Sequence, residues 1–385
     1  MNTTISGSTT SRFEFIDLLR GWAVFVMIET HVVNAILLPE LKEQPLFKAL
    51  TFINGLVAPS FLFCAGMALA LTLQRKWADY VNMKQPLGRY LIRLLFILVV
   101  GYSLHLPFFS LARLRALTDE QAWIPFYQVD ILQTIASSLF FLTMLAVFTR
   151  RQTVFIWMAT VISAIIIFSS PIIRQMDHTG LPVWFRPYLT TQFKSQFPLF
   201  PWMAFLSSGM LIGFWFLQMK TQGKERAFIN QLLFFSFAAI GISCIAEILP
   251  LTIYPHHDFW RASPEFFFVR LGCVTLFLCL LWLYEQQHAV SSRSVFTLFG
   301  KESFIVYVVH LLVVYGYTYE WSFIRFFGPH MNYFECAGLF FVLVAAMWAL
   351  AFVWHWMKQW NMRISKLVQF AALAAIVLTF IFKTT

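Results

Sequence analysis

Long apolar runs, separated by short polar connections, dominate the pattern of the chain. About eleven of these runs are long enough to cross a bilayer as helices, because a hydrocarbon core of about 30 Å requires roughly 20 residues at about 1.5 Å per residue. The runs lie near residues 15–38, 52–73, 90–110, 128–149, 153–173, 197–217, 227–249, 264–286, 303–318, 335–357 and 366–382. We therefore predict an all-α fold, a polytopic membrane helix bundle of about eleven transmembrane helices that forms a single domain over residues 1–385.

Basic residues are distributed unevenly among the connections and predict an orientation. One side, which includes the tail at residues 1–14, carries the clusters Arg75, Lys76, Lys84 and Arg89; Arg150 and Arg151; Lys220, Lys224 and Arg226; Arg293 and Lys301; and Lys358, Arg363 and Lys366. By the positive-inside tendency this side is cytoplasmic, so we expect the N-terminus inside and the C-terminus outside the cell (inner) membrane. The opposite loops, rich in aromatic, Pro, His and Arg residues, are expected to form an extracytoplasmic binding surface.

Composition excludes several classes of protein. Hydrophobic residues make up 59% of the chain and charged residues 12%, which excludes a soluble domain. The net charge of +10 lies in short clusters between apolar runs, so we interpret it as a signal for topology and predict no nucleic-acid partner. The five cysteines stand singly in apolar runs and predict neither a disulfide framework nor a metal site. Gly209 and Gly213, four residues apart, predict close helix packing.

The first apolar run carries ionisable residues, which are costly in lipid and are by default functional. At about 100° per residue, Asp17, Arg20, His31 and Asn34 share one face of the helix, and Glu29 lies on the other side. Asp17 and Arg20 can pair locally, and His31 lies about 17 Å further along the same face. The alternative is a polar seam that only orients this helix against its neighbours.

Several motifs resemble a known family. IDLLRGWAVFVMIETH, in which Arg20 precedes His31, resembles the first-helix signature of the transmembrane acyltransferase superfamily, which includes the acyltransferase type 3 proteins. Four further segments, in matching order, resemble bacterial relatives of heparan-α-glucosaminide N-acetyltransferase: APSFLFCAGMALAL, VDILQTIA, FPLFPWMAFLSSGMLIG and FGKESFIVYVVHLLVVYG. The resemblance implies a bundle of about eleven spans that transfers an acyl group, usually acetyl from acetyl-CoA, to an amino or hydroxyl group of a sugar across the membrane.

The chain departs from the family pattern in two places. Lysosomal members have Asn at the position of His31 and a His in the next loop, whereas residues 39–51 contain no His. The chemistry would then rest on His31, as in the O-acyltransferase branch. That branch has two arginines three residues apart in helix three, where this chain has Arg89 and Arg93 four apart.

Acyl transfer from a thioester requires a base, and the imidazole pKa of about 6.5 suits neutral pH. We predict that His31 is this base, that Asp130 orients its ring, and that Arg270 stabilises the developing oxyanion or holds an acidic acceptor. From their depths in the predicted helices, the three meet in one outward cavity. An ion pair with Glu265 is the alternative for Arg270, and Asn34 is assigned to substrate binding.

Acyl-CoA is cytoplasmic, so its phosphates require basic residues at the inner side. We assign Arg20, Arg89 and Arg93, with Lys301 nearby, to cofactor binding; the alternative for such loops is a purely topological role. Ser303, Tyr307 and His310 share one helix face and resemble the family's residues there. They form either a polar wall beside the CoA channel or an interhelical hydrogen-bond set.

Three classes of function follow from the sequence. The first is an acyl-CoA-dependent acetyltransferase whose partners are a saccharide or glycolipid acceptor and the lipid bilayer. A transporter or flippase for a glycan or lipid-linked sugar is the second, and a non-catalytic scaffold is the third. The sequence leaves open the acceptor, N- or O-acylation, the acyl group, a covalent acyl-histidine intermediate, and the oligomeric state.

Overall fold

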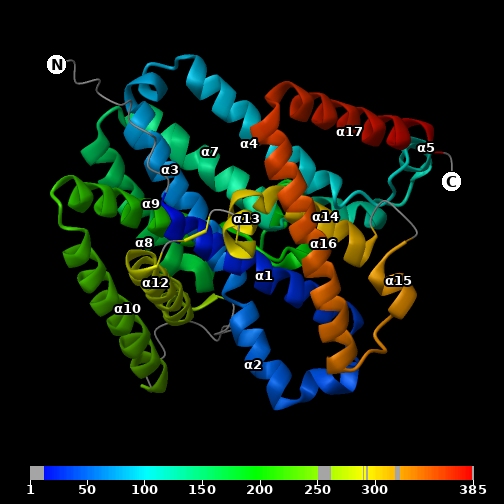
Figure 1. Ribbon diagram of the computed structural model, residues 1–385, viewed down its shortest axis with the longest axis horizontal. Helices are drawn as coiled ribbons and strands as arrows, with labels where there is room; N and C mark the ends of the chain where they lie inside the picture. Colours follow the sequence, from blue (N-terminus) through cyan, green and yellow to red (C-terminus); the bar gives the residue numbers. More distant parts are fainter. Residues whose placement is uncertain (1–12, 250–261, 289, 292–293, 317–320, 384–385) are drawn as a thin grey trace.

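The computed structural model describes residues 13–249, 262–288, 290–291, 294–316 and 321–383 of the chain. These residues are built into helices (Figure 1), and the described part contains no β-strand beyond one isolated bridge between Leu37 and Met331. The predicted all-α fold is therefore confirmed for this part of the chain.

The long helices follow the predicted apolar runs closely. They are α1 (Glu14–Ile36), α2 (Pro45–Asn54), α3 (Val57–Val81), α4 (Gln85–Ser103), α7 (Ile131–Thr149), α8 (Gln152–Ile173), α9 (Leu199–Thr221), α10 (Glu225–Ile248), α12 (Pro264–Gln287), α16 (Tyr333–Trp360) and α17 (Met362–Phe382). Shorter helices are α5 (Leu111–Ala116), α6 (Ile124–Tyr127), α13 (Val295–Lys301), α14 (Ser303–Tyr315) and α15 (Phe323–Phe327).

Nine helices of the described chain are long and apolar enough to cross a membrane. They are α2 with α3 as one span, and α4, α7, α8, α9, α10, α12, α16 and α17. A further candidate is α13 with α14, which are bent by 95° where they meet. Helix α1, 23 residues long, is not among these candidates; it carries the charged residues Glu14, Asp17, Arg20 and Glu29. The chain is therefore an integral, multi-pass membrane protein, and eleven spans stays a prediction.

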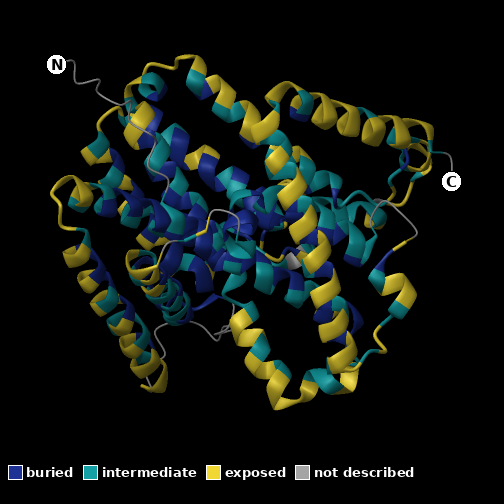
Figure 2. Cartoon of the chain, viewed as in Figure 1, coloured by how far each residue is buried: buried dark blue, intermediate teal, exposed yellow. Residues whose placement is uncertain are grey.

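Helix α1 lies at the centre of the bundle (Figure 1), where it packs against α3, α12, α13, α14 and α16. Fourteen of its 23 residues are buried, whereas Ser365 alone is buried in α17. Figure 2 shows this contrast between the buried centre and the exposed outer helices. Among the ionisable side chains of α1, Asp17 is buried and Glu14, Arg20, Glu29 and His31 are half-buried, so protein covers at least part of each, as a membrane protein requires.

Helix α1 crosses α13 in backbone contact, and glycine makes this approach possible. A Cβ atom added to Gly21 would collide with the backbone of Phe296, and one added to Gly300 would collide with the backbone of Asp17. Small residues of this kind allow two membrane helices to approach closely. The crossing fixes α13, and with it the start of α14, against the first half of α1.

A second close crossing joins α3 and α9. A Cβ on Gly209 would collide with the carbonyl of Phe63, and one on Gly213 would lie 2.9 Å from the Cβ of Ala70. The prediction that these two glycines serve close helix packing is confirmed.

The predicted ninth span, near residues 303–318, is not a single straight helix with a free start. Its helix α14 is preceded by α13, and Glu302 stands at the 95° bend between them. The Glu302 carboxylate is buried and accepts from His355 Nδ1 at 2.8 Å and from Lys358 Nζ at 2.6 Å, both on α16. A lone carboxylate inside an apolar run would be costly. The bend turns Glu302 toward α16, where the carboxylate is paired.

Candidate functional site

His31 lies on α1, five residues before the end of the helix. Two backbone hydrogen bonds to Met331 hold this end of α1 in place. The backbone N–H of Leu38 donates to the Met331 carbonyl at 2.9 Å, and the N–H of Met331 donates to the Ile36 carbonyl at 2.9 Å. The half-buried His31 ring places Nδ1 3.1 Å from the hydroxyl of Tyr315. This hydrogen bond fixes the orientation of the imidazole, the kind of support that a ring used in chemistry requires.

Tyr315 is the last residue of α14, and it reaches His31 because α14 packs against α1. Gly316 follows with a φ of 66°, a left-handed conformation that glycine adopts at little cost and that commonly ends a helix. The rings of Tyr315 and His31 are perpendicular, with centroids 5.5 Å apart. Tyr315 was missed by the sequence analysis, although it belongs to the quoted segment FGKESFIVYVVHLLVVYG.

His310 is the second imidazole of the site. Its ring is fully buried and lies 5.2 Å from the His31 ring and 5.8 Å from the Tyr307 ring, measured between centroids. His310 Nδ1 lies 2.8 Å from the Val306 carbonyl oxygen. The structure thus brings together His31, His310 and Tyr307, three of the residues predicted from the sequence.

Asp130 begins helix α7, and the start of this helix explains part of the VDILQTIA motif. Its carboxylate accepts from the N–H of Ile131 at 2.9 Å, and the side chain of Gln133 accepts from the N–H of Asp130 at 3.3 Å. This reciprocal pattern is a capping box. The other carboxylate oxygen lies 3.5 Å from His105 Nε2.

The Asp130 carboxylate therefore contacts His105. The hydrogen-bond partner of His31 Nδ1 is Tyr315. Tyr315 therefore occupies Nδ1, and the orienting role predicted for Asp130 stays a prediction.

Arg20 lies at the other end of α1, in the crossing with α13. Its guanidinium is 3.7 Å from the Asp17 carboxylate, so the predicted local pair is present, and Nη1 donates to the Gly300 carbonyl at 3.3 Å. The hydrogen bond to Gly300 joins α1 to α13 at their crossing. Arg20 therefore has a structural role in addition to the cofactor binding predicted for it.

Arg89 and Arg93 lie on the exposed surface of α4. One turn beyond Arg93, the ring of Phe96 lies 5.9 Å from the ring of Phe304 on α14, measured between centroids. This contact places the turn of α4 that carries Arg93 beside the half-buried Ser303. The polar positions of α14 then continue from Ser303 through Tyr307 and His310 to Tyr315 at His31.

Arg270 lies on α12, where its guanidinium carbon is 3.9 Å from the ring centroid of Phe266 and 5.4 Å from that of Trp202. Its Nη2 also lies 3.1 Å from where a Cβ of Gly55 would stand. Arg270 thus lies among α12, α9 and the turn at Gly55, and its predicted role beside His31 stays a prediction.

Two remaining predictions concern Glu265, on α12, and Asn34, near the end of α1. Glu265, the alternative partner of Arg270, has a buried Oε2 without a hydrogen-bond partner among the described residues. Asn34 is exposed, and its backbone carbonyl accepts from Lys42 Nζ at 2.9 Å. Within the described residues, no group of three or more His, Cys, Asp or Glu side chains could hold a metal ion.

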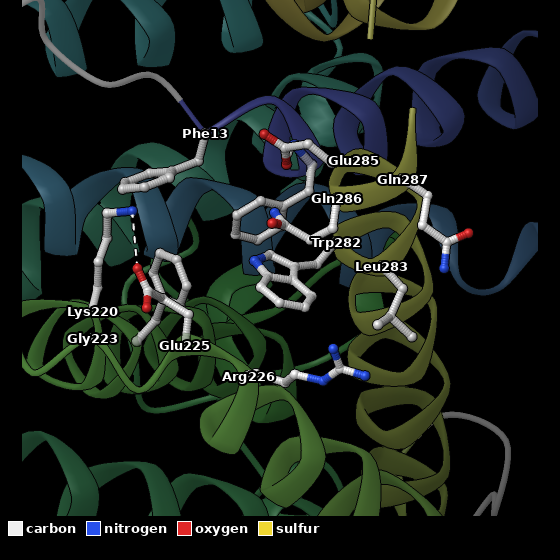
Figure 3. A pocket seen from close by; sticks show the side chains of 12 residues that line it. Phe13, Lys220, Gly223, Glu225, Arg226, Trp282, Leu283, Glu285, Gln286 and Gln287 are labelled. Atoms are coloured by element: carbon white, nitrogen blue, oxygen red, sulfur yellow. Dashed lines mark hydrogen bonds and ion pairs between the residues drawn. The ribbon is translucent and has the colours of Figure 1, made fainter. Parts of the chain in front are cut away.

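A cavity of about 540 Å³ opens at the N-terminal end of α1, between α9, α10 and α12 (Figure 3). Three of its four charged side chains, Lys220, Glu225 and Glu285, are engaged with one another or with the backbone. Lys220 Nζ donates to Glu225 at 3.3 Å, and Glu285 accepts from the N–H of Phe15 at 2.9 Å. Phe15 stands 16 residues before His31, about 24 Å along the helix. The cavity is thus separate from the paired imidazoles.

Comparison with known families bears on these observations. The family model described as heparan-alpha-glucosaminide N-acetyltransferase, catalytic, matches residues 12–249. No curated protein matches the chain at a significant level. The matched range includes His31, Arg89, Arg93 and Asp130, whereas α12 and α14 lie beyond it. Since the match covers more than half of the chain, the resemblance seen in the sequence is confirmed, and the protein belongs to the membrane family of heparan-α-glucosaminide N-acetyltransferase catalytic domains.

Proposed function

We propose that this protein transfers an acetyl group from cytoplasmic acetyl-CoA to an amino or hydroxyl group of a sugar on the opposite side of the cell membrane. Its membership of an acetyltransferase family supports the reaction class. The observation that carries the proposal is the half-buried His31 ring, which lies inside a membrane bundle beside the Tyr315 hydroxyl and a second imidazole. Glucosamine is the first acceptor to test, because the family's name refers to a glucosaminide.

In this proposal His31 is the general base. Its Nδ1–H donates to the Tyr315 hydroxyl oxygen, which leaves the lone pair on Nε2 to take a proton from the attacking amine or hydroxyl. The nucleophile adds to the thioester carbonyl, the carbon–sulfur bond breaks, and the departing thiolate takes up the proton. The negative charge of Asp130 stabilises the imidazolium formed on the way.

The acyl donor and the acceptor approach from opposite ends of the bundle. Arg89 and Arg93 hold the phosphates of CoA, with Lys301 nearby, and Arg20 acts through its hold on α13. The pantetheine arm follows the polar positions Ser303, Tyr307 and His310 of α14. The acceptor meets Asn34 at the exposed end of α1, and Arg270 stabilises the developing oxyanion or, with an acidic acceptor, holds its acidic group.

Acetyl-CoA is expected to raise the melting temperature of the purified protein, whereas free acetate at the same concentration is not. A ligand that binds the folded state stabilises it by RT ln(1 + [L]/Kd), about 2.7 kcal/mol at a hundredfold excess over Kd. The measurement is thermal unfolding in detergent. Neither a scaffold nor a flippase requires an acetyl-CoA site, so an unchanged melting temperature at millimolar acetyl-CoA argues against the transferase.

Replacing Tyr315 by phenylalanine is expected to lower kcat by about 10- to 100-fold, the usual cost of removing a group that orients a functional imidazole. The KM for acetyl-CoA should change little. A matched control is Tyr333→Phe, because the Tyr333 hydroxyl donates to the Leu41 carbonyl at 2.8 Å and does not touch His31. Equal losses of kcat in the two variants would show that Tyr315 has no special role in orienting His31.

The double variant Arg89→Gln with Arg93→Gln is expected to raise the KM for acetyl-CoA by about tenfold, since charge-assisted hydrogen bonds contribute about 1.5–3 kcal/mol. The kcat should be retained. Arg150→Gln with Arg151→Gln removes an equally exposed basic pair from the same predicted side and serves as the control. If both pairs affect KM alike, the effect is one of overall charge, and no phosphate clamp exists.

A further inference from the structure

His310 carries a buried hydrogen-bond acceptor that nothing in the described part of the chain satisfies. Its Nδ1 faces the carbonyl oxygen of Val306, which can only accept, so the proton must lie on Nδ1. The neutral ring therefore has its lone pair on Nε2. That atom is buried and has no hydrogen-bond partner among the described residues. An unsatisfied buried acceptor is costly and requires an explanation.

The position of His310 indicates what kind of group can satisfy Nε2. The ring adjoins His31, and His310 stands five residues before Tyr315, on the side of α14 from which the acyl donor approaches in the proposed function. A thioester that is attacked beside His31 has its sulfur there as well. In the pantetheine arm an amide N–H follows the sulfur after two carbons. This N–H is a hydrogen-bond donor, and in the bound acyl donor it lies close to the reacting carbonyl.

We propose that His310 Nε2 accepts a hydrogen bond from the amide N–H nearest the sulfur of the acyl donor. The inference rests on the proposed function and adds to it a residue that selects donors. The bond satisfies the buried lone pair only when an amide-bearing thioester is present. It also holds the thioester carbonyl against His31, so that donors without this amide react more slowly.

Two small thioesters test the bond directly. S-acetyl-N-acetylcysteamine contains the amide, and the acetyl thioester of 2-mercaptoethyl acetate has an ester oxygen in place of the N–H and is otherwise the same molecule. The purified full-length protein is given glucosamine as the acceptor, and thiol release yields kcat/KM for each thioester. The ratio of the two values does not depend on how much of a variant is correctly folded.

The wild-type protein is expected to favour the amide-bearing thioester by about tenfold, the size of one net hydrogen bond. In His310→Phe, which fills the space without an acceptor, the ratio should fall to about one. His310→Gln offers a carboxamide oxygen and should restore part of the preference. His178→Phe is the control, since His178 is also a buried histidine whose ring contacts a backbone carbonyl, that of Ile173 at 2.8 Å, and it should keep the wild-type ratio.

A wild-type ratio near one, or a preference retained in His310→Phe, would overturn the inference. If His310→Phe turns over too slowly, thermal stabilisation by the matching unreactive thioethers gives the same comparison of amide with ester. Failure of the proposed function looks different: the wild-type protein would then release thiol from neither small thioester nor from acetyl-CoA. Equal release from both small thioesters contradicts the role of His310 alone.

Discussion

The variant His31→Ala is expected to lose acetyl transfer almost completely, with kcat lowered by about 10²- to 10⁴-fold. In the proposed mechanism the substitution removes the imidazole whose Nε2 takes the proton from the nucleophile while the Tyr315 hydroxyl supports Nδ1. His31→Gln can keep a hydrogen bond to Tyr315 but cannot act as a base at neutral pH, so it should be as inactive as His31→Ala. The measurement is acetyl transfer to glucosamine by purified variants.

Two controls separate chemistry from folding in this experiment. The melting temperatures of both His31 variants should stay close to that of the wild type, because the ring is only half-buried. His288→Ala removes an exposed histidine at the end of α12 and should leave transfer unchanged. If His31→Gln transfers acetyl groups at the wild-type rate, His31 is not the base.

Replacing Glu302 by glutamine is expected to destabilise the protein by about 3 kcal/mol, because removal of one partner from a buried ion pair leaves the other without its countercharge. Lys358 is the group affected, and its partial exposure limits the loss to the lower end of the usual range. The measurement is the free energy of unfolding in detergent. Because Glu302 stands where α13 meets α14, kcat should fall as well.

A double-mutant cycle isolates this interaction. Lys358→Met removes the cation, and in the double variant with Glu302→Gln most of the lost stability should return. Glu225→Gln breaks the exposed pair with Lys220 and should change stability little. If the Glu302→Gln loss persists unchanged in the double variant, the carboxylate stabilises the bend through some contact other than Lys358.

Much of the fold could be predicted from the sequence, because membrane helices must satisfy their backbone groups internally and reveal themselves as long apolar runs. The predicted runs at residues 15–38 and 264–286 correspond closely to α1 and α12. The Asp17–Arg20 pair was also predictable, since residues three apart on a helix are neighbours.

The rest of the site depends on tertiary contacts that helical spacing does not encode. The bend at Glu302 arises from partners more than 50 residues later, His355 and Lys358. Tyr315 meets His31 because α14 packs against α1, which brings together residues 284 positions apart in the chain. The prediction that Arg270 shares a cavity with His31 depends on estimated depths in the helices, and it stays a prediction.

The most direct test of the central claim uses sealed vesicles with the predicted cytoplasmic face outward, labelled acetyl-CoA outside and glucosamine inside. Wild-type vesicles should accumulate labelled acetylated sugar in their lumen, and vesicles with equal amounts of His31→Ala should accumulate almost none. The account is contradicted if the two preparations label the sugar at the same rate, or if the wild-type lumen stays unlabelled while acetyl-CoA remains intact outside.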